Sequence, residues 1–273
     1  MADNSVFLFD IDKVIRGKAP KNYKYIPRFL VSYIKRIVHQ DELNKFLGEN
    51  TDKVGVDFLE ATLKLFDTKV DIKGIENLPE GGPSTFVCNH PLGGLDGISL
   101  GWVLGRRYNG RIKYIVNDLL MNLHNLAPLC IPVNKTGNQS RRLPEIIEKG
   151  FQSDENLILF PAGLCSRRVN GEIKDREWGK AFITKSVETK RDVVPMYFEG
   201  HNSNFFYNLS RIRQLLGIKF NIEMLYLADE MFKNKHKTFR LTIGKPIPWQ
   251  TFDSQKQPLE WSAYVRDLVY KLR

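Results

Sequence analysis

Apolar residues recur along this chain with two different spacings, and the spacing changes near residue 70. Before that point they return every three to four positions, which is the spacing of an amphipathic helix. The clearest set comprises Ile26, Phe29, Leu30, Tyr33, Ile34 and Ile37. A second pattern of the same kind occupies residues 56–67. We therefore expect residues 1–70 to form a short helical element at the N-terminus.

From residue 71 to residue 273, short apolar runs alternate with stretches of helical spacing. Strands are predicted at residues 85–89, 112–117, 129–134, 156–161, 192–198 and 239–244. Helices are predicted at residues 97–107, 117–125, 140–151, 177–188 and 258–273, and residues 220–232 fit either element. Strands separated by helices favour a parallel sheet whose two faces are covered. The predicted fold class is therefore α/β, with a mostly parallel sheet flanked by helices.

The composition is that of an ordinary globular protein. Of the 273 residues, 42% are hydrophobic and 26% are charged, which argues against a disordered chain. No segment approaches the ~18–20 apolar residues of a membrane-spanning helix, and the start of the chain lacks the pattern of a secretory signal. Three widely spaced cysteines without a CxxC pair argue against a disulfide framework or a zinc site.

The formal net charge of +10 favours an anionic partner, such as nucleic acid, an anionic lipid surface or an acidic substrate. Residues 1–40 contribute eight Lys or Arg against three Asp, beside the apolar residues of the predicted helix. Such a helix either lies in a membrane interface or packs on its own domain, and spacing alone does not choose between them. A nucleic-acid-binding protein is the alternative from another class, although the chain has no RNP, KH or helix–turn–helix signature.

Three polar, glycine-bearing loops follow predicted strands. They are NHPLGGLDG at residues 89–97, NKTGNQSRR at residues 134–142 and PAGLCSRR at residues 161–168. Ligand sites of open α/β sheets collect at the carboxyl ends of the strands, so we expect the three loops to converge on one pocket. A hydrolase with Cys165 or Ser166 as nucleophile is a further possibility, but the third loop is not a GxSxG elbow.

In the first loop, His90 and Asp96 are six residues apart, and a continuous helix would point their side chains in different directions. Gly93 and Gly94 permit the positive φ angles that would fold the chain back and bring the pair together. A carboxylate bonded to one imidazole nitrogen makes the other nitrogen a better base. The alternative is that Asp96 only caps a helix.

Four blocks, taken in order, resemble the lysophospholipid acyltransferase (PlsC-like) superfamily. They are NHPLGGLD at residues 89–96, LCIPVNKTG at 129–137, FPAGLCSR at 160–167 and DVVPMYFEG at 192–200. The resemblance covers about residues 70–250. The spacing His-x5-Asp in place of His-x4-Asp, and Ala162 in place of a glutamate, are more similar to the hemolysin-named branch and its amino-lipid O-acyltransferase relatives.

The resemblance implies that His90, oriented by Asp96, takes the proton from an acceptor hydroxyl. This hydroxyl then attacks the thioester of acyl carrier protein or acyl-CoA, with no cofactor and no metal ion. A lyso-lipid acceptor is implied, with a mono-acylated amino lipid such as a glycine-lipid precursor favoured and lysophosphatidic acid as the alternative. Residues 71–273 would form the acyltransferase domain, and residues 1–70 would contact an anionic membrane.

The same resemblance implies a peripheral protein on the cytoplasmic side of the inner membrane, with no nucleic-acid partner. Without a glutamate at position 162, Arg167 and Arg168 are expected to be less neutralised and suited to an anionic head group. The residues predicted to bind substrate are Asn89, Asn134, Lys135, Phe160, Pro161, Gly163, Ser166, Arg167 and Arg168.

Overall fold

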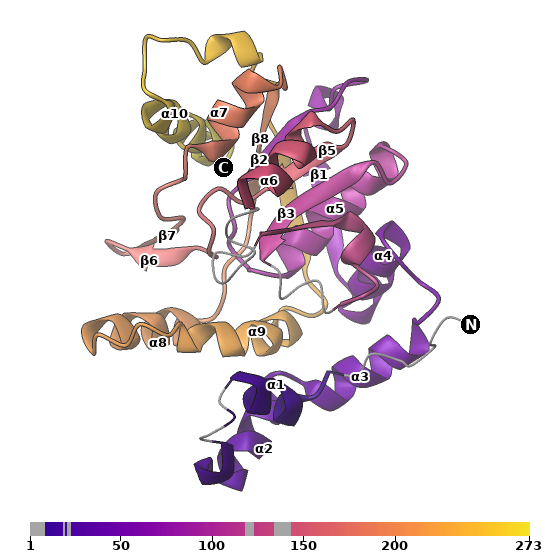
Figure 1. The fold of residues 1–273 in the computed structure, drawn as a ribbon, viewed down its shortest axis with the longest axis vertical. Coiled ribbons are helices and arrows are strands. Elements are labelled where there is room, and N and C mark those ends of the chain that lie inside the picture. The colour runs from indigo at the N-terminus through magenta and orange to yellow at the C-terminus, as the bar shows by residue number, and fades with distance from the viewer. Residues whose placement is uncertain (1–8, 19, 21–22, 118–122, 134–142) are drawn as a thin grey trace.

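A computed structural model of the chain describes residues 9–18, 20, 23–117, 123–133 and 143–273. Figure 1 shows a sheet flanked by helices in the upper part of the view. Two further helices, α8 (Asn204–Leu215) and α9 (Leu227–Lys233), lie below the sheet in the same view. The N-terminal helices α1 (Ile11–Lys18) and α2 (Arg28–Ile37) lie lower still.

In the described residues, seven strands form the main sheet, in the order β1–β9–β8–β2–β5–β3–β4. Their bounds are β1 Lys69–Lys73, β2 Thr85–Cys88, β3 Ile112–Asn117, β4 Cys130–Val133, β5 Asn156–Leu159, β8 Val193–Phe198 and β9 Thr238–Ile243. Each pair of neighbours is parallel except β8 and β9. The predicted α/β class with a mostly parallel sheet is confirmed. A separate hairpin joins β6 (Arg167–Val169) to β7 (Glu172–Lys174).

The central strand β2 contributes to two cores, because successive side chains of a strand point to opposite faces of the sheet. Phe86 and Cys88 pack in a cluster with α4 (Val56–Leu65) and α5 (Leu95–Arg107). Val87 packs in the other cluster with α7 (Ala181–Glu188) and α10 (Pro258–Lys271). Burial on both faces explains why Phe86, Val87 and Cys88 of this strand form an unbroken apolar run.

The N-terminal region is helical as expected, with α1 (Ile11–Lys18), α2 (Arg28–Ile37) and α3 (Gln40–Glu49) preceding α4. Val31 and Ile37 of α2 are buried in a small cluster with Tyr226 of the 3₁₀ turn η6 (Ile222–Tyr226). Phe29, from the same predicted stripe, is 75% exposed. Helix α2 therefore packs on its own chain with one side and leaves apolar surface open on the other.

The predicted domain boundary at residue 70 stays a prediction. Leu59 of α4 is buried in the main core beside α5 residues such as Leu100, so the last N-terminal helix is packed on the sheet region. In the described part of the chain, no helix has both the length and the apolar composition needed to cross a bilayer.

Most predicted elements are found close to their predicted bounds, including α6 (Leu143–Gln152) and the closing helix α10. Residues 220–232, left open by the sequence, are helical in η6 and α9. The helix predicted at 117–125 is wrong for its described residues: Asn117 ends β3, and residues 123–125 are not helical. Tertiary contacts override the apolar spacing there, since Asn125 donates to the carbonyls of Asn50 and Lys53.

Candidate active site

The carboxyl end of β2 delivers Asn89 and His90 directly into the loop at residues 89–97. Asn89 is buried, and its side chain bridges two parallel strands: its amide donates to the carbonyl of Phe198 (2.9 Å) and its oxygen accepts from the Phe198 N–H (2.7 Å). These two bonds fix the start of the loop against the end of β8. Asn89 is thus engaged with the backbone, and its predicted contact with substrate stays a prediction.

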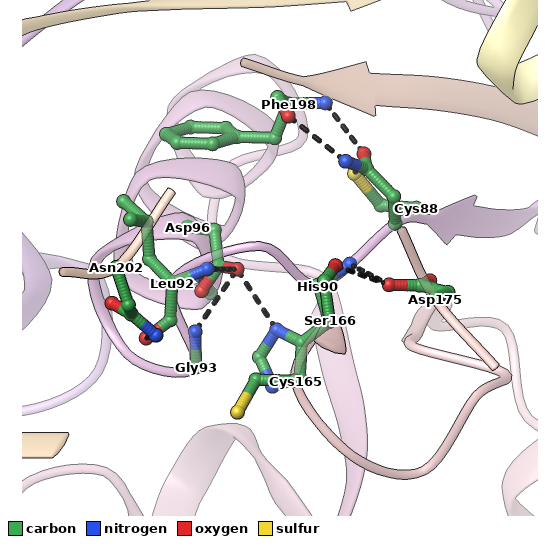
Figure 2. A network of polar contacts seen from close by, with 12 residues as sticks. Cys88, His90, Leu92, Gly93, Asp96, Cys165, Ser166, Asp175, Phe198 and Asn202 are labelled. Atoms are coloured by element: carbon green, nitrogen blue, oxygen red, sulfur yellow. Dashed lines mark hydrogen bonds and ion pairs between the residues drawn. The ribbon is translucent and has the colours of Figure 1, made fainter. Parts of the chain in front are cut away.

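His90 and Asp96 meet as the loop sequence requires (Figure 2). The Nδ1 atom of His90 lies 3.0 Å from Oδ2 of Asp96. Gly93, with φ of 77°, makes the reversal that a residue with a Cβ would adopt only with strain. The same Oδ2 accepts from the N–H groups of Leu92 (2.9 Å) and Gly93 (3.2 Å), and Oδ1 accepts from Gly97 N–H (2.8 Å). The carboxylate therefore also organises the first turn of α5.

Each member of the pair stabilises the charged form of the other. Burial disfavours the imidazolium, but the Asp96 carboxylate, with a smaller contribution from Asp175, more than offsets burial and raises the pKa of His90. Burial likewise disfavours the charged carboxylate, while His90 and the loop N–H groups lower the pKa of Asp96 overall. Asp96 is fully buried and the His90 side chain is 19% exposed. With Nδ1 bonded to Asp96, Nε2 is the nitrogen left for proton transfer.

The loop after β5 forms one wall beside the imidazole. The ring of Phe160 stacks on His90, with 3.9 Å between ring centroids and 23° between the planes. Gly163 has φ of 68°, and its N–H closes a turn onto the Phe160 carbonyl at 2.9 Å. The carbonyl of Pro161 accepts from Gly179 N–H (3.0 Å), which ties this turn to the start of α7. The structure thus brings the first and third predicted loops together.

Asp175 is a site residue that the sequence analysis missed. Its Oδ1 accepts from the His90 N–H (3.2 Å) and from the Ser166 hydroxyl (2.6 Å), and its Oδ2 accepts from the indole of Trp178 (2.9 Å). Burial raises the pKa of this carboxyl, although these donors oppose the shift. Asp175 joins the two loops through the backbone of His90 and the hydroxyl of Ser166, a role that no motif spacing in the sequence indicates.

The thiol and hydroxyl considered as nucleophiles are not activated in this structure. Cys165 is buried, and burial raises the pKa of its thiol to about 11, so it is protonated near neutral pH. The Ser166 hydroxyl donates to Asp175 rather than to an imidazole, and the Ser166 N–H donates to the His90 carbonyl (2.7 Å). Ser166 therefore supports the position of His90, and the hydrolase alternative loses its chemical basis.

Arg167 and Arg168 differ in their surroundings. Arg167 is buried, and its guanidinium pairs with the fully buried Glu223 at 2.9 Å. The expectation that Arg167 is poorly neutralised is therefore wrong, because a carboxylate from a distant part of the chain takes that place. Arg168 is exposed and donates to the amide oxygens of Asn204 (2.6 Å) and Asn208 (3.4 Å). Arg168 is the one that an anionic group can reach from solvent.

Ala162 packs among apolar side chains beside the second core, where the phospholipid enzymes carry a glutamate. The predicted substrate residues Asn134 and Lys135 lie outside the described residues. Among the residues that are described, no group of three His, Cys, Asp or Glu side chains gathers as potential metal ligands. The chemistry that the described loops support is that of an imidazole base, His90, held by the buried carboxylate of Asp96.

Comparison with known proteins identifies the family of this chain. A sequence model of a family described as acyltransferase matches residues 13–273. The lyso-glycine lipid O-acyltransferase of Phocaeicola vulgatus is 68% identical over 272 residues, which cover 100% of this chain and 98% of the relative. The lyso-glycine lipid O-acyltransferase of Bacteroides thetaiotaomicron is 66% identical over 272 residues, with 100% of both chains covered.

A solved structure supports the same fold. The crystal structure of the 1-acyl-sn-glycerophosphate (LPA) acyltransferase PlsC from Thermotoga maritima matches with a TM-score of 0.51. The match covers 96% of this chain and 93% of that chain, at 15% sequence identity. At that identity the likeness concerns the fold alone.

Proposed function

The chain belongs to the acyltransferase family, and from this premise we propose that it transfers a fatty acyl group from a thioester to the hydroxyl of a lyso-glycine lipid. The family and the O-acyltransferase activity predicted from the sequence motifs are confirmed by the family match and by the names of the two relatives. The observation that carries the proposed chemistry is the 3.0 Å contact between His90 Nδ1 and Asp96 Oδ2.

In the proposed reaction, Nε2 of His90 takes the proton from the acceptor hydroxyl as its oxygen attacks the thioester carbonyl. A carbon–oxygen ester bond forms and the carbon–sulfur bond breaks. The imidazolium then returns its proton to the departing thiolate, so His90 ends the cycle neutral. No acyl-enzyme is needed, which agrees with the buried, protonated state of Cys165.

Asp96 has two tasks in this mechanism. It fixes the tautomer of His90 with the proton on Nδ1, and it stabilises the imidazolium that forms during attack. The three backbone N–H groups that bond to its oxygens keep the carboxylate in place without help from solvent. The stacked ring of Phe160 limits rotation of the imidazole, so the base is held in one orientation.

The acceptor assignment rests on the two relatives of 66–68% identity and on the chemistry at position 162. A lyso-glycine lipid offers a hydroxyl for acylation and a carboxylate as its anionic group. Ala162 gives no carboxylate to bind a glycerol phosphate head group, and Arg168 is the exposed guanidinium that a carboxylate can reach. The donor is proposed to be acyl carrier protein or CoA carrying a long acyl chain.

We place the protein at the cytoplasmic face of the inner membrane as a peripheral enzyme, because its acceptor and product are lipids. Residues 1–40 support this, since α2 exposes Phe29 and Leu30 beside a surplus of basic residues. Basic amphipathic helices with exposed aromatic residues bind anionic interfaces.

The function is tested by lipid profiles of cells with and without the gene, measured by mass spectrometry. We expect loss of the doubly acylated glycine lipid and accumulation of its lyso form. Re-expression of the normal chain should restore the profile, whereas His90→Ala at the same protein level should not. Unchanged glycine lipids, with a shift in phosphatidic acid instead, would point to the phospholipid reaction.

A further inference from the structure

The carboxyl end of α8 and the turn that follows it form an exposed apolar surface, which we name the apolar tip (residues 211–220). Its large side chains are open to solvent, with Leu215 76%, Leu216 68% and Phe220 65% exposed. Ile212 and Ile218 add to the same surface. Apolar side chains gathered in this way on a soluble protein mark a surface that contacts another apolar phase.

The exposed charges within the tip are basic. Arg211 and Lys219 are exposed within it, and Arg168 is exposed on the neighbouring strand β6. No Asp or Glu occurs between residues 200 and 222, and Glu223, which follows, is buried. This combination of exposed apolar side chains with exposed basic residues is complementary to the interface of an anionic bilayer.

The tip is a built turn and is fixed to the rest of the fold. Gly217, with φ of 66°, ends α8 and reverses the chain. Arg213 donates to the carbonyl of Ile218 (2.7 Å) and, through Nε, to the buried carboxylate of Glu223 (2.9 Å). The apolar side chains are therefore held outward, because polar bonds beneath them fix the backbone.

The same buried carboxylate joins the tip to the catalytic loop. Glu223 also pairs with Arg167, which lies next to Ser166, and the Ser166 N–H donates to the carbonyl of His90. A surface fixed in this way has a defined orientation relative to the imidazole. Helices α8 and α2 both lie below the sheet in Figure 1, at the end of the molecule away from α10.

We propose that the apolar tip inserts into the interface of an anionic membrane and forms a second contact besides the N-terminal helices. A second copy of the chain fits this surface less well. A two-fold contact would set Arg211 and Lys219 of one copy against the same basic residues of the other. The choice of a lipid surface rests on the proposed function, in which the acceptor and product are lipids.

The experiment is sedimentation of the full chain with vesicles, in the absence of any substrate. Two vesicle types are used, phosphatidylcholine alone and phosphatidylcholine with phosphatidylglycerol. The test variant combines Leu215→Ser with Phe220→Ser, and the matched control is Leu259→Ser, which removes an apolar side chain of 54% exposure from α10. A third variant combines Arg211→Glu with Lys219→Glu. Circular dichroism checks that each variant is folded, as expected for exposed positions.

We expect the double serine variant to bind phosphatidylglycerol vesicles at least about tenfold more weakly, because two large side chains lose their burial among the acyl chains. The charge-reversal variant should lose binding to these vesicles mainly at low salt. Leu259→Ser should bind like the unmodified chain. Equal binding by all variants would overturn the proposal, and so would a dimer-to-monomer change in the serine variant with unaltered vesicle binding.

A second assay tests the proposed function independently of vesicle binding. The unmodified chain is assayed with detergent-dispersed lyso-glycine lipid and a long-chain acyl donor. Absence of product there would contradict the acceptor assignment and leave the vesicle result standing. Product formation together with equal vesicle binding by all variants would refute only the proposal that the apolar tip binds the membrane, and would leave the proposed function in place.

Discussion

Replacement of Asp96 by asparagine tests whether the buried carboxylate serves His90 or only the start of α5. The two oxygens of Asp96 accept from four groups: the imidazole, Leu92 N–H, Gly93 N–H and Gly97 N–H. Asparagine offers one acceptor oxygen, so its amide group must face an N–H donor on one side or the other. One buried donor left without a partner costs about 1–3 kcal/mol, which the folding free energy should lose.

In Asp96→Asn, the rise in the activation free energy should exceed the loss of folding free energy. A hydrogen bond to a charged group contributes about 1.5–3 kcal/mol. Loss of that bond from the imidazolium formed in the transition state lowers kcat by roughly ten- to 150-fold. A histidine held in the wrong tautomer adds to this, up to about 10⁴-fold in all. Binding of the thioester should be spared, because Asp96 is fully buried and contacts only His90 and the loop.

The pH dependence of kcat is an independent test of the role of Asp96. His90 acts as a base when neutral, so the rate rises as the pH passes upward through the pKa of His90. In the normal chain Asp96 raises this pKa against the opposing effect of burial. With asparagine, burial remains and the carboxylate is gone, so the acidic limb of kcat against pH should move to lower pH while the plateau falls. A folded Asp96→Asn variant with near-normal kcat and an unmoved acidic limb would show that Asp96 is only a helix cap.

Further variants follow from the same geometry. His90→Ala should lower kcat by on the order of 10²–10⁴ in a chain that still folds, with Tm lowered because Asp96 loses its imidazole partner; substantial turnover in this variant would exclude a general base at position 90. Arg168→Ala should raise the KM of the acceptor more than that of the donor, because its exposed guanidinium is the one that an anionic group can reach, whereas Arg167→Ala should mainly lower Tm because Glu223 loses a partner; an acceptor KM that does not change in Arg168→Ala would remove Arg168 from the acceptor site. Phe29→Ser combined with Leu30→Ser should weaken binding to anionic vesicles, more mildly than removal of residues 1–40 and without uncovering the packed side of α2; unaltered binding would mean that this face has no membrane role.

The parts of the site that the sequence predicted are local in the chain. His90, Gly93 and Asp96 fall within seven residues, so the motif contains both the functional groups and the glycine that folds them together. Six of the seven strands described in the main sheet were predictable for a similar reason, and β1 (Lys69–Lys73), which carries three charged residues, was not predicted. A strand such as β2, buried on both faces, is mainly apolar and ends where polar loop residues begin.

The parts that the sequence did not predict depend on distant partners. Asp175 bonds to the backbone of His90 across 85 positions, and Glu223 pairs with Arg167 across 56 positions. The sequence around a single acidic residue does not indicate which distant residue it will pair with, because that pairing depends on how the chain packs. The helix wrongly predicted at 117–125 shows the same limit, since contacts of Asn125 with residues near the end of α3 decide its backbone.

The measurement that tests the account most directly is a competition between two acceptors. Purified protein receives one long-chain acyl donor with equal amounts of lyso-glycine lipid and lysophosphatidic acid, and both products are quantified by mass spectrometry. His90→Ala, matched in amount, is run beside it. We predict acylation of the lyso-glycine lipid in clear preference and almost none with the variant. Preferential acylation of lysophosphatidic acid would contradict the proposed acceptor. Product from His90→Ala in the same amount as from the unmodified protein would contradict the proposed role of His90 as the base.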